Sequence, residues 1–272
     1  MTSVFKSDLA SITLYTDEFN KRLRIDDYAG DANEVFLMIR KSYKSWAEKI
    51  IIKSRKSELT FFESRGYHQE AFVKGYFNGE DMFFLVKYLT ETRSKNASEI
   101  EENKIIESIL KEPLPSTLPD VASVELATEQ DADELTQLYA ATFKVYPTPI
   151  GESGYVLKTM REGTIYVLIR ESGKVVSAAS AEIVHQFSNA ELTDCATFPE
   201  TQSKGHMKKL LFKLEEILKE KNIHCLYTIA RSSSHSMNKV FYQLHYAFGG
   251  MMINNCYIYS GLEDMNVWFK TI

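Results

Sequence analysis

The sequence predicts an α/β (α+β) fold in which helices flank a mixed, mostly antiparallel sheet. Residues 164–198 contain three closely spaced strand patterns separated by short polar turns, which is typical of an antiparallel meander. An amphipathic helix pattern over residues 207–218 then joins two strand patterns, and a single helix between neighbouring strands implies a parallel crossover. A strand, helix and hairpin pattern over residues 49–89 repeats the order found near the C-terminal end.

Size and charge limit the classes of partner. The chain has 272 residues and a formal net charge of −5, so it lacks the basic footprint that nucleic acids and anionic membranes require. The first residues do not resemble an apolar signal core, and no run approaches the roughly 20 apolar residues of a membrane span. We therefore expect a cytoplasmic protein without a nucleic-acid or membrane partner.

The cysteines and histidines lack the spacing of a structural site. Cys195, Cys225 and Cys256 are odd in number and far apart, which argues against a disulfide framework and against zinc. The six histidines are scattered along the chain. We expect reduced thiols and no metal.

Composition divides the chain into two units. Between residues 90 and 123 a polar helix pattern is followed by three of the six prolines. This predicts an N-terminal half-unit over residues 1–92, a helical and proline-containing linker over 93–121, and a larger domain over 122–272.

The larger domain shows its elements in a regular order. Thr128 followed by Asp131 marks the start of a helix that continues to Phe143. The patterns that follow are three strands, a helix, a strand, a helix and two strands, at residues 164–170, 175–184, 190–198, 207–218, 223–230, 232–246, 248–254 and 256–261.

The N-terminal unit resembles the tail of the larger domain. Asn78-Gly79 is a hairpin signal, and the two preceding helices end alike at Tyr67 and Tyr246. We infer a partial duplication whose N-terminal copy lacks any counterpart of the loop around Gly205; the alternative is a chance recurrence. The half-repeat extends the sheet either within one chain or across a homodimer.

The loop before the helix at residue 206 has the chemistry of an anion site. A helix start presents unpaired backbone N–H groups and a partial positive charge, which suit a phosphate or pyrophosphate. Gly205 lets an anion approach the backbone closely because it carries no side chain. The loop contains neither Gly-Lys-Ser/Thr nor Gly-x-Gly-x-x-Gly, so it is not a nucleoside triphosphate or dinucleotide loop.

This order of elements resembles the GCN5-related N-acetyltransferase (GNAT) family. The family's loop pattern, Gln or Arg, two residues, Gly, one residue, then Gly or Ala, is matched by Gln202 and Gly205 but departs at Met207. The resemblance implies that acetyl-coenzyme A is the co-substrate and that loop residues hold its pyrophosphate. These are the backbone N–H groups of Gln202, Ser203, Lys204, Gly205, His206 and Met207, with the side chains of Lys204 and Lys208 available to the phosphates.

A second motif of the family lies on the following helix. Asn238 matches the asparagine of this motif, and Phe241 and Tyr242 match the aromatic residues at the end of its helix. The resemblance implies that Asn238 contacts the cofactor arm and that Tyr242 protonates the leaving thiolate. The alternative is that the aromatic pair belongs to the core.

The resemblance extends to one group within the family. The stretches AELTDCATFPETQSKGHM, MNKVFYQLHYAFGGMMINNCYIYSGLEDMN and FVKGYFNGED are similar to those of the β-lysine N-acetyltransferases, and the similarity covers nearly the whole chain. It implies transfer of an acetyl group to the ε-amine of β-lysine. The alternatives are another small amine such as a polyamine or lysine, and a non-catalytic module that binds acetyl-coenzyme A.

Acetyl transfer needs a neutral amine, whereas an ammonium of pKa about 10.4 is almost fully protonated near pH 7. A carboxylate that takes this proton is therefore expected. Strand alternation places Asp194 on the covered face with Leu192 and Ala196, so Asp194 is the preferred base and Glu182 the second choice.

The strand that ends at the loop completes the predicted site. The segment Cys195, Ala196 and Thr197 should splay from its neighbour and leave backbone groups free for the pantetheine amides and the thioester oxygen. The resemblance implies direct attack, so Cys195 is not expected to be a nucleophile. Tyr146, Asn254 and Asn255 are the candidates for binding the substrate's carboxylate and second amine.

Overall fold

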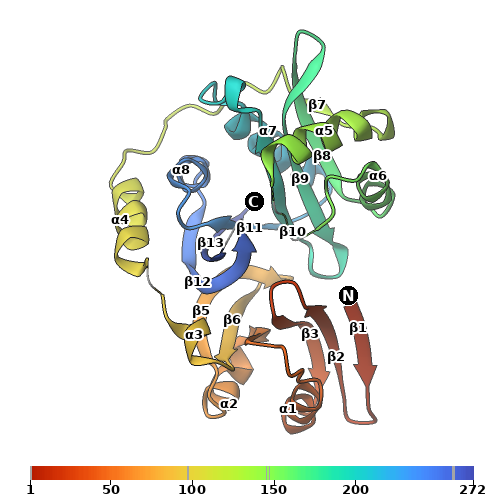
Figure 1. The fold of residues 1–272 in the computed structure, drawn as a ribbon, viewed down its shortest axis with the longest axis vertical. Coiled ribbons are helices and arrows are strands. Elements are labelled where there is room, and N and C mark those ends of the chain that lie inside the picture. Colours follow the sequence, from red (N-terminus) through yellow and green to blue (C-terminus); the bar gives the residue numbers. More distant parts are fainter. Residues whose placement is uncertain (1, 97, 145, 147, 259–260) are drawn as a thin grey trace.

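The strands form one curved sheet in the order β1-β2-β3-β4-β6-β5-β12-β13-β11-β10-β9-β8-β7 (Figure 1). The computed structural model describes residues 2–96, 98–144, 146, 148–258 and 261–272. The pairs β3–β4 and β10–β11 are parallel, whereas the other strand pairs of the described residues are antiparallel. The predicted mixed, mostly antiparallel sheet is therefore confirmed.

The N-terminal half contains six strands and two helices. Its elements are β1 Thr2–Lys6, β2 Ala10–Asp17, β3 Arg22–Gly30, α1 Ala32–Lys41, β4 Lys49–Arg55, α2 Leu59–Glu63, β5 His68–Phe77 and β6 Glu80–Tyr88. A connecting segment follows with α3 Glu91–Ser94 and α4 Glu99–Leu110. The predicted strand, helix and hairpin over residues 49–89 is present, whereas the elements over residues 1–48 had not been predicted.

The C-terminal half adds the remaining elements. They are β7 Glu125–Leu126, α5 Ala132–Thr142, α6 Ser153–Arg161, β8 Ile165–Glu171, β9 Lys174–Val184, β10 Asn189–Thr197, α7 His206–Glu220, β11 Cys225–Arg231, α8 His235–Gln243, β12 Ala247–Ile258 and β13 Gly261–Thr271. The amphipathic pattern of α7 buries Leu210, Leu214 and Leu218 beside Phe241 of α8 in one hydrophobic core. Helix α6 and the strands β7 and β13 had not been predicted. The two closing strands predicted over residues 248–254 and 256–261 fall largely within the single strand β12.

The two halves repeat the same arrangement of strands. In each half an antiparallel strand leads into a parallel crossover, and an antiparallel hairpin closes the unit, so β1 to β6 correspond in order to β8 to β13. The repeated arrangement is therefore longer than predicted, because it includes the crossover helix α1 as the counterpart of α7. The long loop before α7 has no counterpart, since Asp31 alone separates β3 from α1.

The halves join within one chain where β5 pairs with β12. Ala71 faces Gly250 in an antiparallel register. The approach is close, because a Cβ on Gly249 would lie 2.3 Å from the carbonyl oxygen of Phe72 and one on Gly250 would lie 2.4 Å from that of Glu70. The Gly249-Gly250 pair thus allows the sheet to continue from one half into the other. The proposed domain boundaries near residues 92 and 121 remain a prediction.

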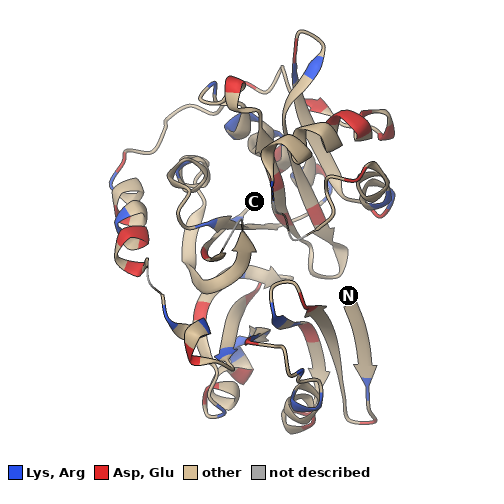
Figure 2. Cartoon of the chain, in the orientation of Figure 1, with Lys and Arg blue, Asp and Glu red and all other residues tan. Residues whose placement is uncertain are grey.

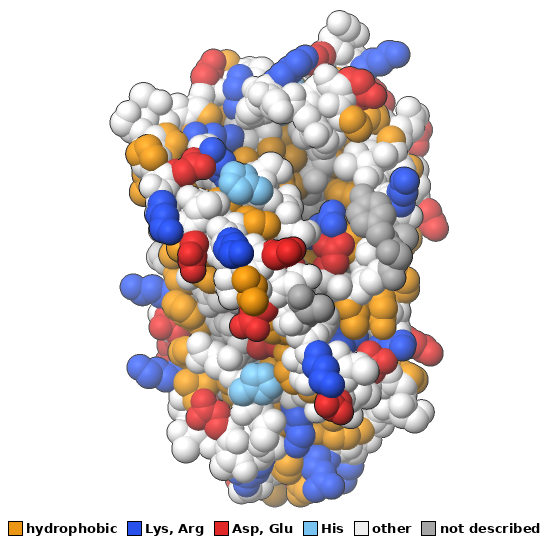
Figure 3. All heavy atoms as spheres, turned by 60° about the vertical axis from the view of Figure 1, so that its left-hand side comes forward, with side chains coloured by type: hydrophobic (Ala, Val, Ile, Leu, Met, Phe, Trp, Pro, Cys, Tyr) orange, Lys and Arg blue, Asp and Glu red, His pale blue; other side chains and the backbone are white. Residues whose placement is uncertain are grey.

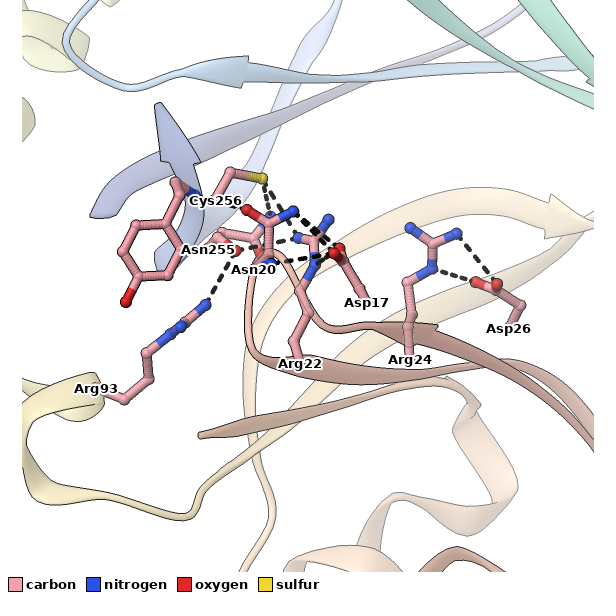
Figure 4. A network of polar contacts seen from close by, with 9 residues as sticks. Asp17, Asn20, Arg22, Arg24, Asp26, Arg93, Asn255 and Cys256 are labelled. Carbon is pink, nitrogen blue, oxygen red and sulfur yellow. Dashed lines mark hydrogen bonds and ion pairs between the residues drawn. The ribbon is translucent and has the colours of Figure 1, made fainter. Parts of the chain in front are cut away.

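Buried polar contacts fasten the β2–β3 turn to β12 (Figure 4). Arg22 donates from Nε to Asp17 Oδ2 at 2.7 Å and from Nη1 to the Asn255 carbonyl oxygen at 3.1 Å. The Asn20 amide oxygen accepts from the backbone N–H of Tyr257 at 2.7 Å. Arg93 donates to the same Asn255 carbonyl oxygen at 3.2 Å. These contacts bring the basic side chains of β3 up to the C-terminal half.

The surface in Figure 3 carries interspersed acidic and basic side chains. No helix in the described part of the chain is long and apolar enough to cross a membrane.

Candidate active site

A cavity of about 910 Å³ runs between the two halves. Its walls come from the start of α7, the strands β9, β10 and β11, the inner face of α8, and the strands β2, β3 and β4 of the N-terminal half. The cavity therefore connects the predicted cofactor loop with side chains that lie more than 150 residues earlier in the chain.

The start of α7 presents unpaired backbone N–H groups at one end of this cavity. Gly205 is the N-cap residue with φ 76°, and no side chain caps the helix. The first intrahelical bond runs from the N–H of Lys209 to the carbonyl oxygen of Gly205 at 3.3 Å, so the N–H groups before it remain for a ligand. In α1, by contrast, the Asp31 carboxylate accepts from the N–H of Glu34 at 2.9 Å. Only the C-terminal copy of this crossover thus keeps a helix start open to an anion.

The side chains of the loop have different roles from those predicted. Gln202, Ser203, Gly205, His206, Met207 and Lys208 line the cavity. Lys204 does not line it, because its Nζ lies 2.7 Å from Glu171 Oε2 on β8. His206 Nε2 lies 3.0 Å from Glu171 Oε1. Lys208 is therefore the loop cation that reaches the cavity, and the prediction that the Lys204 side chain is available to phosphates is wrong here.

Strand β10 splays from β11 as expected. The two strands pair in parallel from Asn189 to Glu191 and then separate. A bulge interrupts the pairing with β9 between Thr193 and Ala196, and Asp194 adopts φ 51° within it. The backbone pairing with β11 ends at Glu191, and the Leu192 carbonyl oxygen still accepts from Thr228 Oγ1 of β11 at 2.8 Å, so the edge of β10 that is released beside the cavity begins after Leu192.

The predicted strand residues divide between the cavity and the core. Cys195 and Thr197 line the cavity. Ala196 packs in the core with α5, and its carbonyl oxygen accepts from Ser177 Oγ at 3.1 Å, so it does not line the cavity. Burial raises the pKa of the Cys195 thiol, with a further contribution from Asp194. A neutral thiol is a poor nucleophile, which agrees with direct attack by the amine.

Two carboxyl groups face each other on the cavity wall. Glu182 of β9 is paired directly with Glu191 of β10, and both line the cavity. Enclosure by protein raises the pKa of Glu182 to about 7, and the charges of Glu191 and Asp194 add to this effect, although its side chain remains open to cavity water. Glu191 accepts a hydrogen bond from the Tyr227 hydroxyl at 2.8 Å.

Asp194 lies deeper than these two groups. It is 6% exposed, and it accepts hydrogen bonds from Ser180 Oγ at 2.6 Å and from the Tyr146 hydroxyl at 2.8 Å. Burial raises its pKa, and the two hydrogen bonds only partly offset this effect. Tyr146 also lines the cavity and stacks on Phe143, with ring centroids 4.5 Å apart. Asp194 therefore fixes the position of Tyr146.

The predicted roles of Tyr242 and Asn238 are wrong. The Tyr242 hydroxyl donates to the carbonyl oxygens of Leu110 at 3.3 Å and Glu112 at 2.9 Å, outside the cavity. Its neighbour Phe241 lines the cavity instead, because successive residues of an α-helix point about 100° apart. Asn238 is fully buried and forms four hydrogen bonds, donating to the carbonyl oxygens of Arg231 and Ser234 and accepting from Asn266 and Trp268. It has no free group for a cofactor.

The two predicted substrate asparagines differ. Asn254 lies outside the cavity lining, and its amide nitrogen donates to the carbonyl oxygens of Arg93 at 3.0 Å and Lys95 at 2.8 Å. Its prediction as a substrate ligand is therefore wrong. Asn255 lines the cavity, is 1% exposed, and has an Oδ1 atom without a hydrogen-bond partner among the described residues.

The contribution of the N-terminal half to the cavity was not predicted from the sequence. Tyr15, Arg22, Arg24 and Lys53 reach the cavity from β2, β3 and β4. The sequence does contain a pattern that indicates this strand, because Arg22 and Arg24 alternate with Leu23 and Ile25, which are buried in β3. Glu191, which lines the same cavity as Asp194, was also missed.

Comparisons with known proteins agree with this geometry. Residues 132–246 match the model of the Acetyltransferase (GNAT) family. The N-acetyltransferase YodP of Bacillus subtilis (strain 168) is 35% identical over 275 residues, which cover 100% of both chains. The Beta-lysine N(6)-acetyltransferase of Methanosarcina mazei is 34% identical, with 82% of this chain and 91% of that protein covered. The protein of the same name from Methanococcus maripaludis is 34% identical, with 82% of each chain covered.

Among solved structures, a phosphinothricin acetyltransferase from Sinorhizobium meliloti in complex with AcCoA is 19% identical and has a TM-score of 0.49 over 56% of this chain and 89% of that one. The segment that matches the family model, residues 132–246, includes the open start of α7. The chain belongs to the acetyltransferase (GNAT) family and is an N-acetyltransferase that uses acetyl-coenzyme A as co-substrate.

Proposed function

We propose that this enzyme acetylates the ε-amine of β-lysine to give N6-acetyl-β-lysine. The observation that carries the proposal is that one cavity joins the uncapped start of α7 to the carboxyl pair Glu182 and Glu191. The choice of β-lysine is supported by the two relatives named for that reaction, each 34% identical over 82% of this chain.

The pyrophosphate of the co-substrate would be held at the first turn of α7. The free N–H groups at and after Gly205 donate to it, and Lys208 adds a positive charge. The released edge of β10 near Cys195 and Thr197 then accepts the pantetheine arm. Acetyl-coenzyme A supplies a thioester whose acetyl carbon the neutral amine attacks, and coenzyme A is released.

Glu182 is the proposed general base. With a pKa of about 7 it accepts a proton near neutral pH, where a base of this strength is most effective. The neighbouring Glu191 carboxylate attracts the ammonium group before the reaction. This assignment reverses the order predicted from sequence, because both oxygens of Asp194 already accept hydrogen bonds from the protein.

A dedicated acid for the leaving group is not required by this scheme. An ordinary thiol has a pKa of about 8.5, whereas Glu182 has a pKa of about 7. An ammonium loses two protons on becoming an amide. Glu182 passes the first to cavity water before the attack, and the second, which it takes from the attacking nitrogen, moves to the thiolate in the favourable direction. This replaces the role predicted for Tyr242.

The second amine of β-lysine needs a hydrogen-bond acceptor. The unpartnered Oδ1 of Asn255 lies on the cavity wall and provides one. The Tyr146 ring adds an aromatic surface for the aliphatic chain.

Thiol release with a panel of amines tests the proposal. We expect β-lysine to give a higher kcat/KM than lysine or a polyamine such as putrescine, and mass spectrometry to place the acetyl group on the ε-nitrogen. Preference for a polyamine would refute β-lysine as the acceptor. Binding of acetyl-coenzyme A without turnover of any amine would refute the assignment of a catalytic base.

A further inference from the structure

We propose that the N-terminal half provides a carboxylate-binding subsite, in which Arg24 and Lys53 select an amino acid over a simple amine. The inference deepens the proposed function and relies on it for the position of the reacting amine. It assigns to the N-terminal half a direct part in choosing the acceptor.

Arg24 and Lys53 occupy one wall of the cavity. They lie on the parallel neighbours β3 and β4, where Arg24 pairs with Ile51, so that Lys53 is two residues further along on the same face. Both side chains line the cavity whose other wall carries Glu182 and Glu191. Figure 2 marks acidic positions on β9 and β10 and basic positions on the strands of the N-terminal half below them.

Asp26 holds both cations in place. Arg24 donates from Nε to Asp26 Oδ1 at 2.6 Å and from Nη2 to Oδ2 at 3.1 Å, and Lys53 Nζ lies 3.2 Å from Asp26 Oδ1. Lys53 also donates to the Tyr76 hydroxyl at 3.0 Å, and the Arg24 guanidinium lies 4.8 Å from the centre of the Tyr15 ring. This fixed arrangement lowers the entropy cost of binding a ligand.

Arg24, Lys53 and Asp26 together carry one more positive than negative charge, and the charge of Glu191 across the cavity also acts on Arg24. Although burial alone would raise the pKa of Asp26, Lys53 and Arg24 lower it to about 2, so Asp26 stays ionised. One carboxylate then neutralises only one of the two cations. Figure 4 shows Arg24 bound to Asp26 through one edge of the guanidinium, and Nη1 has no hydrogen-bond partner among the described residues. That nitrogen remains for an anionic ligand, as does the third N–H of the Lys53 ammonium, whose other two are directed at Asp26 and Tyr76.

The two walls therefore suit a zwitterion. A carboxylate binds at the Arg24 and Lys53 wall, and the distal ammonium lies at the Glu182 and Glu191 wall. A polyamine would bring its second ammonium toward two cations, which is unfavourable. The competing explanation is that Arg24 and Lys53 only balance the charges of Glu182 and Glu191 across the junction, since Arg24 and Lys53 each lower the pKa of Glu182.

The test compares an acid with its amide. Calorimetry in the presence of coenzyme A gives Kd for β-lysine and for β-lysine carboxamide, which differ only in the carboxylate, and lysine with lysinamide forms a second pair. A charge-assisted hydrogen bond predicts that the wild-type protein binds the acid about 10- to 100-fold more tightly. Equal binding of acid and amide, or binding of neither acid, would overturn the inference without any variant.

Variants then locate the subsite. Arg24→Gln should reduce the preference for the acid to near unity while leaving the Kd of the amide within about twofold, and Arg24→Lys should retain part of the preference. Lys6→Gln removes the same charge from an exposed position on β1 and serves as the control. If Arg24→Gln weakens binding of the acid and of the amide equally, Arg24 has a structural role and does not bind the carboxylate. If lysine rather than β-lysine is the better acceptor, the proposed function fails, while the lysine and lysinamide pair still tests the subsite.

Discussion

Glu182 and Glu191 stand directly opposite each other on β9 and β10, with both carboxyl groups in the cavity. Two carboxylates at adjacent positions cannot both ionise freely, so one takes a raised pKa. Enclosure by protein makes Glu182 that group, at about 7. The pair thus places a proton acceptor beside a second carboxyl group that faces the substrate.

Replacing Glu182 with Gln should lower kcat because the amide cannot accept the proton. General base catalysis usually contributes about 10²- to 10⁴-fold, and we expect a loss in this range. In the wild-type enzyme Glu182 must be deprotonated to act, so kcat should rise as the pH increases through about 7. Thiol-release kinetics from pH 5.5 to 9 measure both effects.

The pH profile separates this role from a general charge effect. In Glu182→Gln the step near pH 7 should disappear, whereas Glu220→Gln at the exposed end of α7 should retain it. A profile that keeps the same step in Glu182→Gln would assign the base to another group, with Asp194 the first candidate.

Gly205→Leu should weaken binding of acetyl-coenzyme A. No protein atom lies within 4 Å of the Cβ that a side chain would have there, so the side chain would extend into the space for the ligand. We expect KM for acetyl-coenzyme A to rise about tenfold or more as the N–H contacts are lost.

Gly173 provides a matched control for backbone strain. It has φ 78° in the turn between β8 and β9, with equally open space around its Cβ, but it lies outside the cavity. Gly173→Leu and Gly205→Leu should lose similar stability, about 1–2 kcal/mol for the left-handed conformation. A similar KM for both variants would show that the Gly205 loop does not bind the co-substrate.

Tyr242→Phe should leave kcat within about twofold of the wild type and reduce stability instead. Its hydroxyl binds carbonyl oxygens of the segment after α4 rather than a reacting group. Loss of a hydrogen bond of this kind costs about 1 kcal/mol of unfolding free energy. Urea unfolding and thiol-release rates on the same preparation distinguish the two outcomes, and a large fall in kcat at unchanged stability would restore the catalytic role.

The sequence predicted the elements whose pattern depends on local chemistry. The α7 helix was predicted because Leu210, Leu214 and Leu218 recur at helical spacing and are buried together. The hairpin after residue 67 was predicted because Asn78 and Gly79 suit a tight turn, and both have positive φ in the structure.

The parts that were missed depend on packing between distant segments. Charged residues at Arg22 and Arg24 obscured strand β3, because these side chains face a cavity that only the folded pair of halves creates. Whether Phe241 or Tyr242 faces that cavity depends on how α8 sits on the sheet, which helix periodicity alone does not determine.

The contact between α4 and the C-terminal half should depend on pH. Glu102 accepts from Ser232 Oγ at 2.6 Å and lies beside Asp264. Burial and the interaction with Asp264 raise the pKa of Glu102 to about 7, and burial also raises the pKa of Asp264. A carboxyl whose folded pKa exceeds its unfolded value of about 4.3 stabilises the fold in its protonated form. That contribution is complete below about pH 4.3 and is lost as the pH rises to about 7.

Glu102→Gln keeps the shape of the protonated carboxyl without its titration. We expect this variant to differ little from the wild type at pH 5, where most of that contribution remains, and to exceed it clearly in unfolding free energy at pH 8, because the wild type then carries a buried charge. Glu101 lies one residue earlier and is exposed, so Glu101→Gln should show the same change in unfolding free energy between pH 5 and pH 8 as the wild type. Urea unfolding at pH 5 and pH 8 measures all three proteins. A Glu102→Gln protein that loses as much stability between these values as the wild type would assign the pH dependence to other groups.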